Sequence, residues 1–166
     1  MASDEDLMLE FQRGSRHAFE ELFGRYRALL YGFFRRRVVE RERAEDLLQE
    51  TFLAVLRAGE RYEPRAPFRT YLFGIALKVV AAERRRGRVP AAAAEPVANS
   101  SDETLWVRQA IARLDAPQRE ILMLREYEGL SYEEIATLLE LPANTVRSRL
   151  FRARMALKAC LEASHV

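Results

Sequence analysis

The sequence contains few of the residues that build disulfide-bonded and metal-dependent proteins. Among 166 residues there is one cysteine, Cys160, and there are two histidines, His17 and His165. A single cysteine excludes an intramolecular disulfide, and so few Cys and His side chains argue against a zinc site. No phosphate-binding glycine motif occurs, so no cofactor is expected. The lack of disulfides fits a reducing compartment, and we expect a cytoplasmic protein.

Long apolar runs and a strong excess of charge are also missing. No run of 18 apolar residues occurs, so no membrane span is expected, and the acidic start MASDEDLMLE does not resemble a signal peptide. The net charge is only +2, although 31% of residues are charged and 49% are hydrophobic. This composition predicts a packed core. Whether the partner is a nucleic acid depends on how the charges are distributed.

Most of the sequence has the periodicity of helices, and no segment of useful length alternates as a strand does. Between Phe19 and Phe33, apolar residues recur at spacings of three and four, which predicts one buried helical stripe. Gly14 and Ser15 precede it as an expected helix stop and a new N-cap. The segment GRVPAAAAEPVANSSD has two prolines and no apolar period, so it is predicted to be a flexible linker. The expected fold is all-α, with helical domains at 1–87 and 103–166 joined by linker 88–102, and Ser100 with Glu103 is expected to start the second domain.

A helix-turn-helix is predicted in LSYEEIATLLELPANTVRSRLFRAR. Ser131 and Glu134 form a capping box that starts the first helix, and Pro142 suits the start of the second. Inward residues recur in the second helix at Val146, Leu150, Ala153 and Leu157. The outward residues are Asn144, Thr145, Arg147, Ser148, Phe151 and Arg152. Five basic and no acidic residues lie between Leu141 and Leu161, which is typical of a DNA-reading helix; the alternative is a solvated basic face.

Two further surfaces follow from the first half of the sequence. From Arg57 to Arg88 there are nine basic residues against three acidic ones, interleaved with aromatics, which suits single-stranded DNA, although Phe68 is expected to be buried with Leu72. In the preceding helix, one face is apolar, and it comprises Leu47, Leu48, Phe52, Val55 and Leu56. The opposite face carries Asp46, Gln49, Glu50 and Leu53. That face is either a protein-docking surface or a solvated helix face.

These motifs resemble the extracytoplasmic-function sigma factors of bacterial RNA polymerase. AEDLLQETFLAVLRA resembles the core helix of sigma region 2, PRAPFRTYLFGIA the promoter-melting segment, and LDAPQREILMLREYEGLSYEEIATLLELPANTVRSRLFRAR sigma region 4. The resemblance spans nearly the whole sequence. It implies a region 2 bundle and a region 4 helix-turn-helix in a non-enzymatic protein that directs polymerase to promoters. An anti-sigma factor is an expected partner, together with core polymerase and promoter DNA.

The resemblance also implies roles for individual residues. Asp46, Gln49, Glu50 and Leu53 would dock on the clamp helices of the largest polymerase subunit, and the helices around Ile121 and Leu124 would grip the flap. Ala58–Phe68 would capture a flipped −10 base. Residues implied in −10 binding and melting are Arg61, Tyr62, Arg65, Phe68, Arg69, Tyr71, Lys78, Arg84 and Arg85. Those implied in −35 reading are Asn144, Thr145, Arg147, Ser148, Arg149, Phe151 and Arg152.

The sequence departs from the family pattern at three positions. Lys78 and Ala82 stand where many members carry Asn and Asp, and Glu140 stands where glycine is common in the turn. Two other classes of protein could contain a basic helix of this kind. A dimeric operator-binding regulator would use the same helix-turn-helix but would bind its DNA without polymerase. A small enzyme with an incidental basic helix is disfavoured by the scarcity of catalytic residue types.

Overall fold

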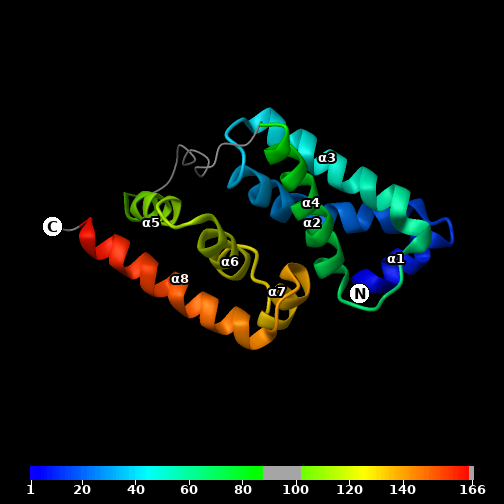
Figure 1. Ribbon diagram of the computed structural model, residues 1–166. Coiled ribbons are helices and arrows are strands. Elements are labelled where there is room, and N and C mark those ends of the chain that lie inside the picture. The colour runs from blue at the N-terminus through cyan, green and yellow to red at the C-terminus, as the bar shows by residue number, and fades with distance from the viewer. Residues whose placement is uncertain (88–101, 165–166) are drawn as a thin grey trace. The chain divides into compact units, whose positions relative to one another are not determined.

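The computed structural model describes residues 1–87 and 102–164, and within them every regular element is helical (Figure 1). The chain divides into two compact units, Met1–Pro90 and Ala91–Val166. The predicted all-α class is therefore confirmed. The predicted linker 88–102 and its Ser100 cap lie outside the described residues, except for Asp102, which begins the second unit's first helix.

The first unit is built from four α-helices and one short 3-10 helix. They are α1 (Asp4–Gln12), α2 (Arg16–Arg35), α3 (Arg41–Ala58), η1 (Gly59–Arg61) and α4 (Phe68–Arg85). Ser15 caps α2 through its side chain, and Gly14 has a φ of 101°, so the predicted stop and restart are confirmed. The predicted stripe on α2 packs inward, and its C-terminal end is fully buried at Leu30 and Phe33.

The second unit contains α5 (Asp102–Ala112), α6 (Ala116–Glu126), α7 (Tyr132–Leu139) and α8 (Ala143–Ala163). Helices α5, α6 and α7 all pack against the long helix α8. Its inward side chains Val146, Leu150 and Ala153 are buried, as predicted. Ile121 and Leu124 are also buried in this core.

One assignment made from the helical pattern was wrong. Leu56 was placed on the apolar face of α3, but its side chain is 39% exposed. Leu47, Leu48, Phe52 and Val55 are buried as expected. At 100° per residue, Leu56 lies at the edge of the stripe, and only the packing of α2 and α4 against α3 decides which edge positions are covered.

Candidate functional site

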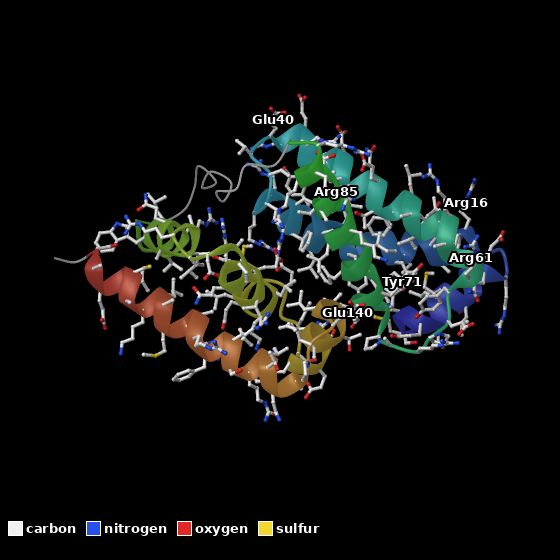
Figure 2. The ribbon with its side chains drawn as sticks, in the orientation of Figure 1. Arg16, Glu40, Arg61, Tyr71, Arg85 and Glu140 are labelled. Carbon is white, nitrogen blue, oxygen red and sulfur yellow. The ribbon has the colours of Figure 1, made fainter. Side chains whose placement is uncertain are left out.

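The turn between α7 and α8 fixes the geometry of the helix-turn-helix. Ser131 Oγ accepts from the Glu134 backbone N–H at 3.1 Å, and the Glu134 side chain accepts from the Ser131 N–H at 3.1 Å. Helix α7 ends at Glu140, which adopts the left-handed conformation with φ 54° and ψ 47° (Figure 2). Pro142 then takes the N-cap position of α8. The turn is thus three residues long, as a helix-turn-helix requires.

The outward face of α8 carries the residues predicted to read DNA. Six of the seven are exposed, and Thr145 is half-buried. Phe151 is 65% exposed, which is a large apolar area to leave in water on a helix that is otherwise basic. Arg147 and Arg149 are two residues apart and so turned by about 200° about the helix axis, at opposite flanks of this face.

Contacts from neighbouring helices separate the arginines of α8 into two groups. The Arg147 guanidinium lies 5.8 Å from the ring centre of Tyr132 on α7, a cation–π contact that restrains it at the edge of the outward face. Arg154 instead pairs with Glu126 of α6 at 2.8 Å, and this hydrogen bond raises the pKa of Arg154. Arg154 is therefore engaged at the surface by an acidic partner of its own unit, whereas Arg147 lies beside an aromatic ring at the edge of the outward face.

The outer face of α3 presents Asp46, Gln49, Glu50 and Leu53, and all four side chains are exposed. Leu53 is 46% exposed, and the exposed Leu56 lies three residues further along the helix. The face is therefore acidic at one end and apolar at the other. We call these five residues the α3 face.

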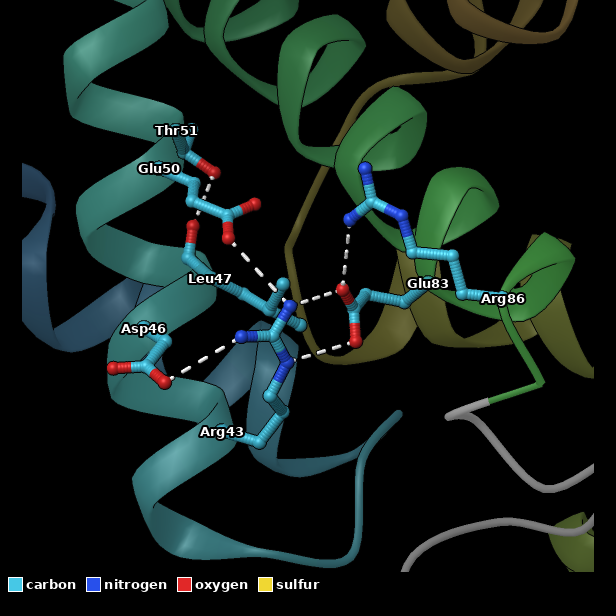
Figure 3. A network of polar contacts seen from close by, with 7 residues as sticks. All are labelled: Arg43, Asp46, Leu47, Glu50, Thr51, Glu83 and Arg86. Atoms are coloured by element: carbon cyan, nitrogen blue, oxygen red, sulfur yellow. Dashed lines mark hydrogen bonds and ion pairs between the residues drawn. The ribbon is translucent and has the colours of Figure 1, made fainter.

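An ion-pair network holds the acidic end of the α3 face (Figure 3). The Arg43 guanidinium lies 3.4 Å from Asp46 Oδ2 and 3.5 Å from Glu50 Oε1. It also donates from Nε to Glu83 Oε2 of α4 at 2.8 Å, with a second bond between the same two groups. Glu83 is fully buried, and its hydrogen bond to Arg43 raises the pKa of the arginine. Arg86 stands 3.5 Å from the same carboxylate.

The connection from Ala58 to Phe68 exposes its cations and buries its aromatics. We call it the −10 segment, after the role that the resemblance implies for it. Arg61 (labelled in Figure 2) and Arg65 are exposed. Phe68 is fully buried, as expected, and Tyr62 is 5% exposed. Both were included among the −10 residues, but in this conformation neither ring is free to stack on a base.

Tyr62, Phe68 and Tyr71 form one aromatic cluster. The rings of Tyr62 and Tyr71 are 5.1 Å apart between centroids, and Tyr26 joins from α2 at 5.6 Å from Phe68. The hydroxyls of Tyr62 and Tyr71 are buried and have no hydrogen-bond partner in the described part of the chain. Burial raises the pKa of Tyr62 to about 12 and also raises that of Tyr71.

The remaining predicted −10 residues of α4 fall on two sides of the helix. Tyr71, Lys78 and Arg85 are seven residues apart, so they lie along one line of the surface, and Figure 2 labels the first and last of them. Lys78 and Arg85 are exposed and Tyr71 is half-buried. Arg69 and Arg84 are turned away from this line.

Reasoning from the sequence missed the residues that support these surfaces. Glu83 and Arg43 were not singled out, and neither were Glu5 and Gln12 of α1, which contact the −10 segment. The sequence did contain a signal that Glu83 is buried. It shares a helical face with the buried Ala76 and Val80, so it is an acidic residue in an apolar stripe. No comparable local signal marks Gln12, whose bonding partners are 47 and 50 residues away.

Among the described residues, no group of three or more His, Cys, Asp or Glu side chains could hold a metal ion. None of the helices described is long and apolar enough to cross a membrane.

A basic helix-turn-helix in one helical unit, together with an acidic and apolar helix face in the other, defines a DNA-binding transcription factor with a protein partner. Comparison with known families is consistent with this. The sigma-70 region 2 family model matches residues 22–89, and that of sigma-70 region 4 matches residues 104–157. The chain belongs to the extracytoplasmic-function sigma factors. It is not an enzyme; it binds core RNA polymerase and directs promoter-specific initiation of transcription.

Known relatives match this chain over nearly its full length and over nearly all of their own. The RNA polymerase sigma-H factor of Pseudomonas aeruginosa is 34% identical over 96% of this chain and 94% of its own length. The sigma factor CarQ of Myxococcus xanthus is 34% identical over 93% and 95%. Among solved structures, CnrH in complex with the cytosolic domain of CnrY aligns with a TM-score of 0.79 and 28% identity over 98% of this chain and 99% of that one. RpoE of Bartonella quintana, bound to the anti-sigma factor NepR, aligns with a TM-score of 0.71 and 26% identity over 87% and 96%.

Proposed function

We propose that this sigma factor divides its work between its two units, with residues 103–166 reading the −35 element and residues 1–87 docking on polymerase and opening the −10 element. The observation that carries the proposal is the exposed face of α8, where arginines, Asn144, Ser148 and Phe151 stand clear of the core. Arginine can bond two acceptors on a guanine edge, and an aromatic ring can press on a thymine methyl. An α-helix fits the width of the major groove.

In the first unit, the α3 face docks on the clamp helices of the largest polymerase subunit. An apolar end beside an acidic end suits a basic partner surface, because leucine gains from burial while the carboxylates steer the encounter. The flap contact is made by side chains around the core of the second unit, since Ile121 and Leu124 themselves are buried. The protein works in the cytoplasm, where its polymerase is.

The −10 segment and the line of Tyr71, Lys78 and Arg85 on α4 contact the non-template strand. Exposed cations can follow the phosphates of a strand as it leaves the duplex. Because Tyr62 and Phe68 are buried, base capture by these rings requires the two side chains to turn out of the aromatic cluster when DNA binds, while the backbone of the −10 segment stays in place. Such a rearrangement is consistent with the unpaired hydroxyl of Tyr62, which gains a partner if it reaches a base.

An anti-sigma factor controls the protein by covering these surfaces. The support is that RpoE of Bartonella quintana, similar over 87% of this chain, was solved with an anti-sigma factor bound.

The test is transcription in vitro with core polymerase on genomic fragments, followed by mapping of the start sites. The proposal predicts start sites with a shared pair of upstream elements, and no specific DNA retention without polymerase. Strong sequence-specific binding by the protein alone would contradict the division of work proposed and favour a free-standing regulator.

A further inference from the structure

Helix α1 lies beside the −10 segment (Figure 1), although the match to sigma-70 region 2 starts only at residue 22, after this helix. Three side chains of α1 contact the −10 segment, two at its start and one at its end. They are Phe11, Gln12 and Glu5.

The side chain of Gln12 binds the backbone at the start of the −10 segment. Its side-chain amide nitrogen donates to the carbonyl oxygen of Gly59 and to that of Tyr62, both at 2.7 Å. The two N–H groups of one amide are thus used on two carbonyls of the same turn. Gly59 begins η1, and its carbonyl also accepts from the Tyr62 backbone N–H at 3.2 Å, so Gln12 adds a second donor to it. Tyr62 follows the last residue of η1, where a helix leaves its carbonyls without intrahelical donors.

Phe11 packs against Gly59, so the start of the −10 segment lies close to α1. A Cβ atom at Gly59 would stand 2.6 Å from Cε1 of Phe11, which leaves no room for any side chain. Gly59 has an ordinary φ of −57°, so its value lies in the missing side chain and not in backbone freedom. The backbone of η1 can therefore rest directly against α1.

Glu5 holds the far end of the −10 segment. Helix α4 begins at Phe68 behind Pro67, whose side chain makes no capping hydrogen bond. The Phe68 backbone N–H donates instead to Glu5 Oε1 at 2.9 Å. A carboxylate at this position accepts from an otherwise unpaired N–H and complements the positive end of the helix dipole.

We propose that α1 is a positioning element for promoter opening, in which Gln12 and Glu5 fix the two ends of the −10 segment and so set where Arg61 and Arg65 meet the non-template strand. This inference rests on the role proposed above for the −10 segment. Both arginines are exposed between the two anchors. A connection held at both ends loses less conformational freedom when it binds DNA, so fixing it speeds productive capture of the strand. Gln12 and Glu5 act through the −10 segment and do not themselves bind the DNA.

The experiment uses holoenzyme assembled from core polymerase and the full chain, on a promoter found by the transcription assay. Gln12→Glu turns a donor toward two carbonyls into a repelling carboxylate, and Gln12→Lys restores N–H donors there. The matched control is Glu10→Gln, an exposed carboxylate on the same helix. The readouts are permanganate reactivity of unpaired thymines on the non-template strand and the rate of open-complex formation. Affinity for core polymerase and thermal unfolding are measured beside them.

Gln12→Glu should slow opening by about fivefold or more while core affinity stays within about twofold of the parent protein. Gln12→Lys and Glu10→Gln should open at nearly the parent rate. The inference is overturned if Gln12→Glu opens the promoter normally, or if core affinity and thermal stability fall in proportion to opening.

Arg61→Ala and Arg65→Ala in the same assay separate the two proposals. If they leave opening unchanged, the role of the −10 segment is wrong; if they slow it while the Gln12 variants do not, only the role of α1 is wrong.

Discussion

Arg43 of α3 and Glu83 of α4 form an ion pair that joins the two helices through a fully buried carboxylate. Nε of Arg43 donates to Oε2 of Glu83 at 2.8 Å, and the same guanidinium lies within 3.5 Å of Glu50 on the α3 face. The pair thus links the helix proposed to dock on polymerase to the helix proposed to meet the −10 element.

Arg43→Ala should destabilise the first unit by about 3 kcal/mol, because it removes from the buried Glu83 carboxylate the guanidinium that binds both of its oxygens. Hydrogen exchange of the α3 and α4 amides, followed by mass spectrometry, measures this without interference from the second unit. The double variant Arg43→Met with Glu83→Leu should recover most of the loss, since it removes both charges. If the α3 and α4 amides of the Arg43→Ala variant exchange as slowly as those of the parent protein, the Arg43–Glu83 ion pair contributes nothing to stability.

Leu53→Asp should weaken binding to core polymerase by about tenfold or more, because it places a charge where an apolar side chain would be buried. Leu56→Asp should act in the same direction, since Leu56 extends the exposed apolar end of the α3 face. Competition against a labelled sigma factor for core polymerase measures both, with Glu20→Gln on α2 as the control. Normal core binding combined with lower thermal stability would mean that this face is structural only.

Arg147→Ala and Arg152→Ala should each cost about 1–3 kcal/mol of promoter affinity if the arginine reads a base with two hydrogen bonds. The loss should be confined to the promoter with the intact −35 base and vanish when that base is changed. Arg154→Ala is the matched control, because Arg154 is paired with Glu126 and should leave promoter choice unchanged. Equal weakening on every −35 sequence would identify a phosphate contact instead.

Glu140→Gly should stabilise the second unit by roughly 1 kcal/mol, because glycine adopts the left-handed backbone at φ 54° without the steric cost that glutamate carries. Denaturant unfolding followed by the fluorescence of Trp106, the chain's one tryptophan, reports on this unit. Ala136→Gly, within α7, is the opposite control and should destabilise by about 1 kcal/mol. A loss of stability in Glu140→Gly would show that the strain at this position is offset by contacts of the glutamate.

The first unit should lose stability above pH 10, on account of Tyr62. Burial raises the pKa of Tyr62 to about 12 in the folded protein, against about 10 for an exposed tyrosine. Between these two pKa values the unfolded chain releases a proton that the folded chain keeps. The free energy of unfolding therefore falls by on the order of 2 kcal/mol as the pH rises through this range. Below pH 10 the contribution is constant.

Tyr62→Phe should reduce this alkaline loss and should not lower stability at pH 7, because the hydroxyl it removes is buried without a partner in the described residues. Urea unfolding of parent and variant at pH 7, 10 and 11, followed by hydrogen exchange in α4, makes the comparison. A variant as sensitive to alkali as the parent would show that another group titrates first.

Helix boundaries, caps and the helix-turn-helix were predictable because the interactions that create them are local. The capping box of Ser131 and Glu134 closes over three residues, and the positive φ at Glu140 falls at the turn position where the family commonly has glycine. The exposure of the α8 reading face followed from its period, since Val146, Leu150 and Ala153 had to pack inward.

The sequence alone therefore determined the class of fold, the order of helices and the face of α8 that is left exposed, since each depends on spacing along one helix. Only the tertiary structure decided that Tyr62 and Phe68 are covered while Arg61 is exposed, and that Leu56 lies outside the core. It also decided the pairs that hold the surfaces in place, Arg43 with Glu83 across 40 residues and Gln12 with Tyr62 across 50. Periodicity says which side of a helix is buried, but partners so distant in sequence are chosen by how the helices pack against one another.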